Sequence, residues 1–197
     1  MKYEHFILFS AVAAAAWFLG VYYWPLLVLH IYKRAILVKG FGDGPIPVNT
    51  LYTQPQKLFA EPIASQSAPG SKLKTTGVNH DTLLTVGWLD LRKGPQILRV
   101  PDMAGRYYSV QLNDPSSNNN FAYVGRRTTG SNAGAYLLTG PGWKGEVPAG
   151  MPRIASPNNA VLVIGRVLVE SDSDLPAAHA LTSQIGLVPL LPGGQRA

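Results

Sequence analysis

The chain has 197 residues, of which 46% are hydrophobic and 14% charged, a balance that favours one folded domain with an additional segment. It contains no cysteine, which excludes disulfide bonds, thiolate zinc sites and a cysteine nucleophile. The net charge of +6 comes from dispersed basic residues without a dense stripe or a nucleic-acid-binding module, so nucleic acid is not an expected partner.

The first predicted element is a transmembrane helix. No residue from Phe6 to Tyr32 carries a formal charge, and about 20 apolar helical residues suffice to cross a bilayer. A cleaved signal peptide is the alternative, but only Lys2 precedes the run, and hydrophobicity continues past the small residues of a cleavage site. Pro25 either kinks the helix or begins a second turn along the membrane surface. We therefore predict an uncleaved anchor and juxtamembrane segment over 1–39, with these anchoring residues: Phe6, Trp17, Tyr22, Tyr23, Trp24, Tyr32, Lys33 and Arg34.

The charges around this helix bear on its orientation. Lys33, Arg34 and Lys39 follow the hydrophobic run, whereas Lys2 and Glu4 precede it. The positive-inside rule then favours a cytoplasmic C-terminal domain. The same basic residues are also attracted to anionic lipid headgroups, whichever leaflet they face.

The remainder is predicted to be a linker over 40–56, rich in glycine and proline, that docks on a β domain over 57–197. Short strand-like runs separated by turn signals predict a mainly β fold, an antiparallel sandwich or barrel. Residues 174–188 are expected to form a short C-terminal helix, with Asp174 as its N-cap and Pro176 in its first turn. The predicted strands are 82–91, 96–100, 107–112, 121–125, 135–139 and 160–170.

Within the last predicted strand, Arg166 lies among apolar residues. By alternation it shares a face with Leu162, Ile164 and Leu168. It is therefore either a buried or partner-facing arginine or one whose charged end reaches solvent.

The strongest catalytic candidates are His80 and Asp81, at the start of a predicted strand. A histidine oriented by a carboxylate is a general base near neutral pH. However, neighbouring strand residues point to opposite faces, so His80 would need Asp102 or Asp114 as its acid. We favour a structural role, in which Asn79 and Asp81 form a turn. The sequence predicts no metal site and no cofactor, because ligand spacings and phosphate or dinucleotide motifs are missing.

The stretch NDPSSNNNFAYVGRRTTG, residues 113–130, is predicted to be first a structural corner, because Asp, Ser and Asn side chains hydrogen-bond their local backbone. A polar binding rim is the alternative, since loops on a rigid β scaffold carry function. Arg126 and Arg127 are expected to alternate faces on the following strand, one of them facing inward or toward Asp114 or Asp102. The rim residues are Asn118, Asn119, Asn120, Arg126 and Arg127.

Five sequence blocks follow one another in order beyond the predicted anchor: PVNTLYTQP, GVNHDTLLTVGWLDLRKGP, VPDMAGRYYSVQLNDPSSNNNFAYVGRRTTG, GPGWKGEVP and SPNNAVLVIGR. Together they resemble the bacterial domain of unknown function 1254 family. The resemblance implies a mainly β domain, which in longer members precedes a second domain, of family 1214, and is exported. The chain resembles the short, membrane-anchored form without that second domain. Export weighs against the charge rule, so we predict a single-pass protein of the bacterial inner membrane with a periplasmic β domain.

These expectations favour a membrane-anchored accessory or assembly subunit, and not an enzyme. Its β domain would bind another protein, either a family 1214-type chain or a larger membrane complex. The alternative is a half-site for small-molecule binding or hydrolysis that a partner chain completes.

Overall fold

The computed structural model describes residues 2–41, 44–58, 79, 81–117 and 119–190. The chain forms two compact units, residues 1–46 and 47–197. The boundary between them lies inside the segment 40–56 that was predicted to be a linker. The first unit holds one long helix, and the second holds the β strands and a short helix.

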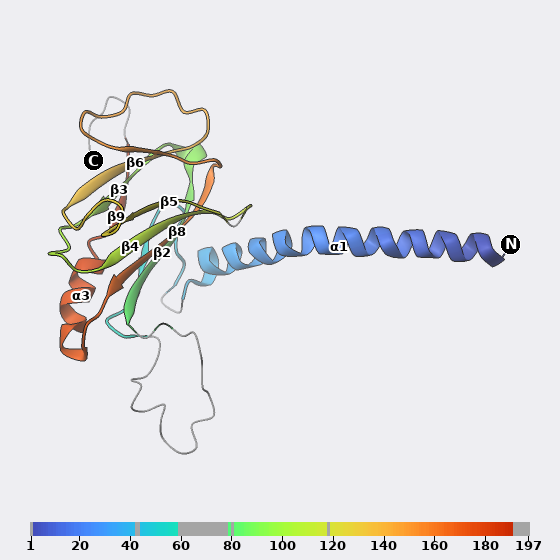
Figure 1. Ribbon diagram of the computed structural model, residues 1–197, viewed down its shortest axis with the longest axis horizontal. Coiled ribbons are helices and arrows are strands. Elements are labelled where there is room, and N and C mark those ends of the chain that lie inside the picture. The colour runs from blue at the N-terminus through green and yellow to red at the C-terminus, as the bar shows by residue number, and fades with distance from the viewer. Residues whose placement is uncertain (1, 42–43, 59–78, 80, 118, 191–197) are drawn as a thin grey trace, which may run out of the picture. The chain divides into compact units, whose positions relative to one another are not determined.

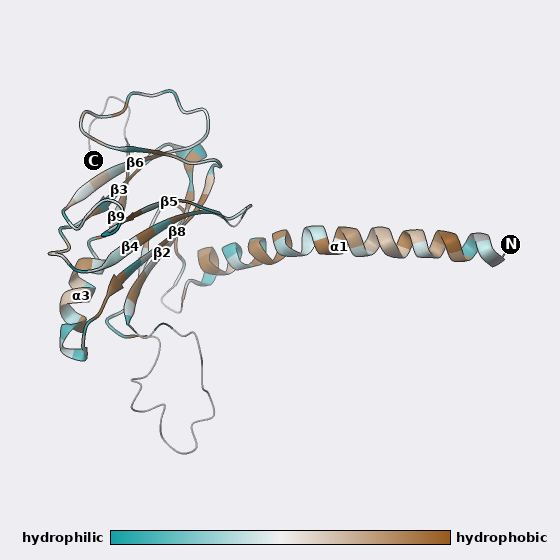
Figure 2. Ribbon diagram, viewed as in Figure 1, coloured by the Kyte–Doolittle hydropathy of each residue, from teal (hydrophilic) through white to brown (hydrophobic). Residues whose placement is uncertain are grey.

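Helix α1 spans Lys2–Lys39, 38 residues, and continues through Pro25 without a break. The predicted second segment at the membrane surface is therefore part of the same helix. At a rise of about 1.5 Å per residue it is roughly 57 Å long, well beyond a hydrocarbon core of about 30 Å. It is long and apolar enough to cross a membrane, and Figure 2 shows apolar residues distributed along it.

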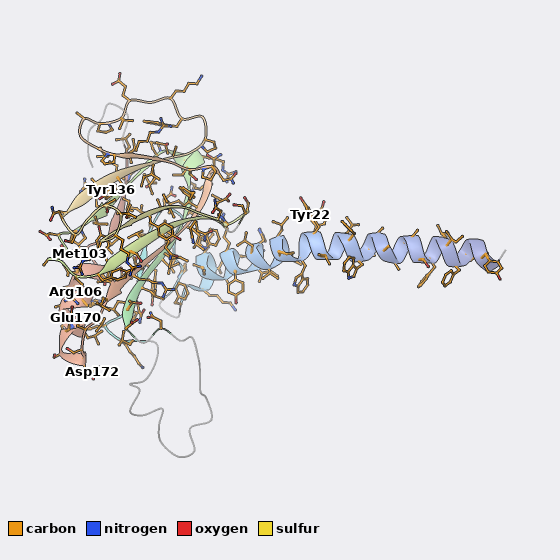
Figure 3. The ribbon with its side chains drawn as sticks, in the orientation of Figure 1. Tyr22, Met103, Arg106, Tyr136, Glu170 and Asp172 are labelled. Atoms are coloured by element: carbon orange, nitrogen blue, oxygen red, sulfur yellow. The ribbon has the colours of Figure 1, made fainter. Side chains whose placement is uncertain are left out.

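The side chains expected to anchor α1 lie on its exposed surface. Tyr22 is 67% exposed and extends away from the helix in Figure 3. The other aromatic residues of this set are also exposed: Phe6, Trp17, Tyr23, Trp24 and Tyr32. Arg34 is exposed and Lys33 half-buried. A helix with large apolar side chains on all sides is stable in lipid, where those side chains leave water.

The second unit is mainly β, as predicted, and its strands form two sheets (Figure 1). The five-stranded sheet has the order β1-β2-β8-β4-β5 and is antiparallel throughout. The four-stranded sheet has the order β7-β6-β3-β9, with one parallel pair, β6 and β7. The strands are β1 (Tyr52–Thr53), β2 (Thr82–Asp90), β3 (Gln96–Val100), β4 (Tyr108–Asp114), β5 (Asn119–Gly125), β6 (Gly134–Thr139), β7 (Arg153–Ala155), β8 (Ala160–Leu168) and β9 (Gly186–Pro189).

The main hydrophobic core lies between the two sheets. It combines residues of the five-stranded sheet, such as Leu89, Val110 and Val163, with Leu98 and Leu138 of the four-stranded sheet. Strand β8 follows the alternation of its sequence, because Val161, Val163, Gly165 and Val167 are buried while the residues between them are not. Its alternate face carries Arg166, which is exposed. Arg166 is therefore not buried, and its charged end reaches solvent.

Part of the predicted linker is built into the β domain. The side-chain amide of Asn49 accepts a hydrogen bond from the Asp90 backbone N–H at 2.8 Å and donates to the Asp90 carbonyl. Gln54 is fully buried, and its amide oxygen accepts from the Leu84 backbone N–H at 3.0 Å. These two amides continue the pairing of β1 with β2 on either side of Tyr52–Thr53. The block PVNTLYTQP therefore has a structural role.

The predicted C-terminal helix is shorter than expected. Helix α3 spans Leu175–Thr182, preceded by a 3-10 turn at Asp172–Asp174. The prediction of helix to residue 188 is wrong, because Gly186–Pro189 form β9 and pair with β3. Backbone hydrogen bonds from Ser183, Gln184 and Ile185 to the last turn of the helix close it before Gly186. The side chain of Asp174 does not cap α3 and instead accepts hydrogen bonds from Arg106 and from the Glu170 backbone.

Candidate functional site

The loop between β4 and β5 is a self-contained polar corner around Asp114. This carboxylate is only 4% exposed. It accepts hydrogen bonds from the backbone N–H and hydroxyl of Ser116 at 2.9 and 2.8 Å, and from the Ser117 hydroxyl at 2.8 Å. The amide of Asn158, which precedes β8, donates to it at 2.7 Å. Two of the sequence blocks thus meet at one buried carboxylate.

The acid–base balance at Asp114 agrees with a structural role. Burial would raise its pKa, but the hydrogen bonds from Ser116, Ser117 and Asn158 outweigh burial and lower the pKa. A carboxylate that accepts this many hydrogen bonds in its charged form has no tendency to take up a proton. Asp114 is therefore a fixed anion that holds the corner together.

Replacement of Asp114 by alanine should lower the free energy of unfolding by about 2 kcal/mol, because several buried donors lose their acceptor. Urea denaturation followed by circular dichroism measures the loss. Asp81→Ala is the matched control, since Asp81 is exposed and its removal should change stability by less than about 0.5 kcal/mol. Equal effects of the two substitutions would contradict a structural role for the corner.

The asparagines expected to form a binding rim lie beside this corner. Asn120 accepts a hydrogen bond from the amide of Asn113 at 2.8 Å, and both Asn119 and Asn120 are exposed. Asn118 lies outside the described residues. Asn120 lies beside the end of β4, where the Asn113 amide group donates to it while the Asn113 side-chain oxygen has no hydrogen-bond partner among the described residues.

Arg126 and Arg127 do not lie on a strand, contrary to the prediction, but in the turn that follows β5. The turn folds back because the backbone N–H groups of Thr128 and Thr129 both donate to the Gly125 carbonyl, at 2.9 and 2.8 Å. Both arginines are exposed. Among the described residues, neither forms an ion pair with Asp102 or Asp114.

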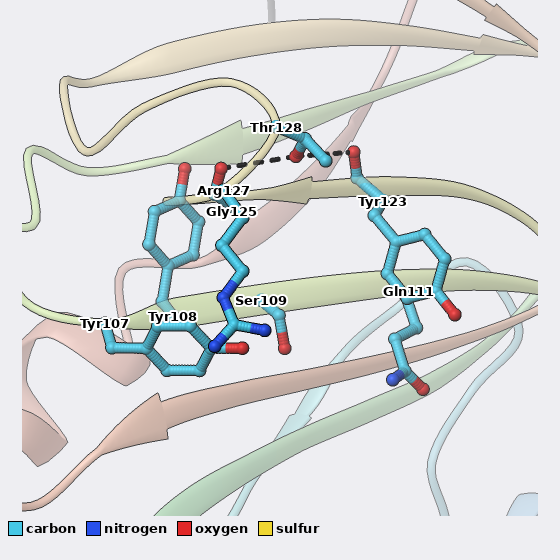
Figure 4. Close-up of a pocket in the computed structure, with 8 residues that line it drawn as sticks. All are labelled: Tyr107, Tyr108, Ser109, Gln111, Tyr123, Gly125, Arg127 and Thr128. Atoms are coloured by element: carbon cyan, nitrogen blue, oxygen red, sulfur yellow. Dashed lines mark hydrogen bonds between the residues drawn. The ribbon is translucent and has the colours of Figure 1, made fainter.

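A hollow lies between this turn and β4 on the outer face of the five-stranded sheet. It has a volume of about 280 Å³. Strand β4 alternates here, so that Tyr108, Val110 and Leu112 enter the core while Ser109 and Gln111 face outward. The residues of this Arg127 hollow, shown in Figure 4, are Tyr107, Tyr108, Ser109, Gln111, Tyr123, Gly125, Arg127 and Thr128.

At the floor of the Arg127 hollow the backbones of β4 and β5 approach so closely that position 125 has no room for a side chain. Gly125 pairs with Ser109 across the sheet. A Cβ at Gly125 would lie 2.6 Å from the Tyr108 carbonyl oxygen and 2.9 Å from the Cα of Ser109, which real side chains do not tolerate. Two small residues therefore face each other between the larger Tyr123 and Arg127.

The side chains around the hollow converge on it. The guanidinium of Arg127 lies over the ring of Tyr107, 5.3 Å from its centroid, and Figure 4 places Ser109 between Arg127 and the side chains of Gln111 and Tyr123. Within the described part of the chain, the hydrogen bonds include none from the side chains of Tyr107, Ser109, Gln111, Tyr123 or Arg127. In this respect the hollow differs from the corner at Asp114, whose polar groups bind one another.

The walls of the hollow are fixed by the fold. The buried hydroxyl of Tyr108 donates to the Gly130 carbonyl at 3.1 Å, and burial raises the pKa of this phenol. The hydroxyl of Thr128 donates to the carbonyls of Tyr123 and Gly125, at 3.0 and 3.2 Å (Figure 4). These bonds hold the turn against β5 and thereby place the backbone of Arg127 beside the hollow.

The catalytic candidates lie elsewhere, at the start of β2. Asp81 is exposed, and its backbone carbonyl accepts from Val169 at 2.7 Å. The side chain of Asn79 caps this strand by accepting from the N–H and hydroxyl of Thr82. His80 lies outside the described residues. Over the described ranges, no group of three His, Asp or Glu side chains is placed to hold a metal ion.

Sequence reasoning identified Arg127 but not the residues around it. The alternation of β4 was the available signal, since it separates Ser109 and Gln111 from the core residues between them. The pairing of Ser109 with Gly125 depends on the register of β4 and β5, which the sequence did not define.

Comparison with known proteins places this architecture in a family. The sequence model of "Protein of unknown function (DUF1254)" matches residues 61–189. Among curated proteins, none matches. The VPA0106 protein from Vibrio parahaemolyticus has a similar solved structure, with a TM-score of 0.61 and 26% identity over 86% of this chain and 36% of that one.

This chain therefore spans about a third of the length of the VPA0106 protein. A putative uncharacterized protein from Burkholderia cenocepacia has a TM-score of 0.37 and 12% identity over 61% of this chain and 31% of its own, and no argument rests on it. The fold and the family match agree. The chain belongs to the DUF1254 family of proteins of unknown function.

Proposed function

We propose that this protein is a single-pass, membrane-anchored accessory or assembly subunit whose β domain binds another polypeptide. The observation that carries the proposal is the Arg127 hollow, where five of the lining side chains form no hydrogen bond among the described residues: Tyr107, Ser109, Gln111, Tyr123 and Arg127. Such side chains on a rigid β scaffold are typical of recognition surfaces, where tyrosine and arginine are enriched. The self-satisfied corner at Asp114 lacks this property.

The sheet edge beside the hollow supports the same function. Strand β5 pairs only with β4 among the described strands, so its outer backbone groups lie at the edge of the five-stranded sheet. Its sequence NNFAYVG has neither proline nor lysine, the residues that commonly protect edges from pairing. A register shift near Leu112 and Asn113 interrupts its pairing with β4, a feature that restricts which partner strand fits.

The similarity to the longer VPA0106 protein suggests which class of polypeptide binds this surface. In that protein the similar region accounts for 36% of the chain, so the domain there belongs to a larger polypeptide. We therefore propose a family 1214-type chain as the partner, or a larger membrane complex that contains one. The β domain would pack against it from the membrane surface.

The location that we propose is the bacterial inner membrane, with the β domain in the periplasm. Helix α1 is long and apolar enough to span a membrane, and the family resemblance supports export. Lys33, Arg34 and Lys39 argue for the opposite orientation by the positive-inside rule. In our proposal these basic residues instead contact anionic headgroups at the outer side.

A second function is a small-molecule half-site completed by the partner chain. It is favoured by the volume of the hollow and by the outward hydroxyl of Ser109 beside Arg127. The described residues that line the hollow include no histidine and no carboxylate. A hydrolytic step there would need its general base from the partner.

Purification of the full chain in mild detergent, followed by mass spectrometry, distinguishes the two functions. The accessory-subunit proposal predicts a second protein in stoichiometric amount after crosslinking and gentle extraction. A small molecule that copurifies without a protein partner would favour the half-site. A chain that purifies alone, with neither, would contradict both.

A further inference from the structure

We propose that the Arg127 hollow is a carboxylate-binding site and that it receives an acidic side chain or chain-terminal carboxylate of the partner polypeptide. The partner as the source of the carboxylate rests on the proposed function, whereas the chemistry of the site rests on its geometry alone. A free organic acid is the other source of the same chemistry. The experiment below distinguishes the two.

The first element of this site is the guanidinium of Arg127. It lies over the ring of Tyr107, 5.3 Å from the centroid, a contact that leaves the N–H groups along the guanidinium edge available. No described residue accepts a hydrogen bond from it or forms an ion pair with it. A planar fork of this kind matches the two oxygens of a carboxylate.

A second positive charge adjoins the hollow. Arg166 on β8 pairs directly with Ser109 on β4, so both side chains lie on the outer face, with Cβ atoms about 5 Å apart. Arg166 is exposed. The two ion pairs among the described residues are Arg92–Asp90 and Arg106–Asp174, and neither neutralises Arg127 or Arg166. Ser109 is therefore a cross-strand neighbour of Arg166 and lines the hollow together with Arg127.

The backbone of the turn argues for a carboxylate and against a phosphate. Phosphate sites commonly use several free backbone N–H groups. Here the N–H of Gly125 donates to the Thr129 hydroxyl, and that of Arg126 donates to the Tyr108 carbonyl. The N–H groups of Thr128 and Thr129 donate to the Gly125 carbonyl. The donors available to an anion are thus mainly side chains, in an arrangement suited to a planar group.

The size of the hollow favours a small part of a larger molecule. Its volume of about 280 Å³ lies just below the range of roughly 300–1,000 Å³ for sites that enclose whole ligands. The rings of Tyr107 and Tyr123 and the stem of Gln111 provide apolar contact beside the charged groups. One residue of a partner, with its carboxylate toward Arg127 and its apolar part against Tyr123, fits this space.

The site chemistry is tested with para-fluorophenylacetate as the probe, by fluorine NMR titration of the full chain in detergent. We expect saturable binding of the probe to the wild-type protein. Binding to Arg127→Gln should be at least about tenfold weaker, because the variant loses one charge-assisted hydrogen-bonded pair. Arg126→Gln is the matched control, because it removes the same charge from the same turn but does not line the hollow. Its affinity should remain within about twofold, since exposed charges outside the hollow contribute little.

Four further measurements test the result. Arg127→Lys keeps the charge but loses the planar fork, so it should bind the probe nearly as weakly as Arg127→Gln. The neutral para-fluorophenylacetamide should bind much more weakly than the acid, and inorganic phosphate should not displace the acid. Unchanged thermal unfolding of each variant shows that it is folded. Absence of saturable binding, or equal losses in Arg126→Gln and Arg127→Gln, would overturn the proposal.

Copurification with Arg127→Gln then identifies the source of the carboxylate. If the variant loses both the copurifying partner and the binding of the probe, the carboxylate belongs to the partner polypeptide. Retention of the partner with loss of probe binding assigns it to a free organic acid and leaves the accessory function in place. Normal probe binding to a wild-type chain that copurifies with no protein would remove the proposed function but not the carboxylate site.

Discussion

Arg106→Ala should lower the free energy of unfolding of the β domain by about 3 kcal/mol, the scale for breaking one partner of a mostly buried ion pair. Arg106 precedes β4, and it contacts the end of β8 and the start of α3. Its guanidinium donates to the Leu168 carbonyl at 2.8 Å and to the Asp174 carboxylate, through its second nitrogen, at 2.6 Å. The two side chains are 14% and 18% exposed. Alanine would leave the Asp174 carboxylate and the Leu168 carbonyl without this donor.

Arg92→Ala is the control for this prediction. Arg92 pairs with Asp90 at 2.6 Å, but its side chain is 74% exposed. Its loss should cost less than about 1 kcal/mol, because water screens the pair and replaces its hydrogen bonds. Urea denaturation followed by circular dichroism compares the two variants. Similar losses in both would show that Arg106 does not fasten α3 to the strands.

The same ion pair makes a specific pH dependence. The hydrogen bond from Arg106 is the main reason that the pKa of Asp174 falls from 3.8 to about 2. A carboxylate whose pKa is lower in the folded state than in the unfolded state stabilises the fold at pH values above its unfolded-state pKa. This stabilisation disappears as the pH falls from about 4 to about 2. Arg106→Ala should therefore flatten this part of the stability profile. An unchanged profile in the variant would assign the acid sensitivity to other carboxylates.

Two arginines introduced into α1, Val12→Arg and Leu19→Arg, should remove the protein from the membrane fraction. Both positions are exposed and apolar, and each arginine costs about 2.5–3.5 kcal/mol near the centre of a membrane helix. The two positions lie two turns apart on one face of the helix. A shift of the helix along the membrane normal therefore cannot keep both arginines out of the hydrocarbon core. The measurement is the fraction that stays in the pellet after carbonate extraction.

The matched control adds the same charge outside the predicted span. Ala35→Arg with Val38→Arg places both arginines beside Lys33, Arg34 and Lys39, where headgroups accept them. This variant should stay in the pellet, with Met1 or Lys2 still present by intact mass. Release of both variants, or a soluble wild-type chain beginning near Trp17, would refute the anchor.

The proposed periplasmic orientation predicts that a reporter after Ala197 is active as alkaline phosphatase and dark as a green fluorescent protein.

The strands were predictable because their signal is local. The run 96–100 is a strand with the expected bounds, and 82–91 and 135–139 differ from β2 and β6 by one residue. Strands β1 and β7 have two and three residues, too few for a period, and their partners define them. Residues 186–188 continue an apolar run after α3, and a short apolar run does not by itself separate helix from strand.

The candidate site was less predictable for a related reason. The abundance of asparagine and serine after Asn113 drew attention to the corner, and the structure shows that Ser116 and Ser117 bind the buried carboxylate of Asp114. The Arg127 hollow depends on which residues face each other across strands. Ser109 lies opposite both Gly125 and Arg166, positions far apart along the chain, and only the register brings them together.

The central claim is that the β domain binds a partner polypeptide through the surface at the Arg127 hollow. Site-specific photocrosslinking in the native host, with benzoylphenylalanine at position 123 or 147, tests it most directly. Tyr123 lines the hollow, whereas Val147 lies on the loop after β6, and the two are 41% and 40% exposed. We predict one discrete protein adduct from position 123 and none from position 147. No adduct from position 123, or the same adducts from both positions, would contradict the claim.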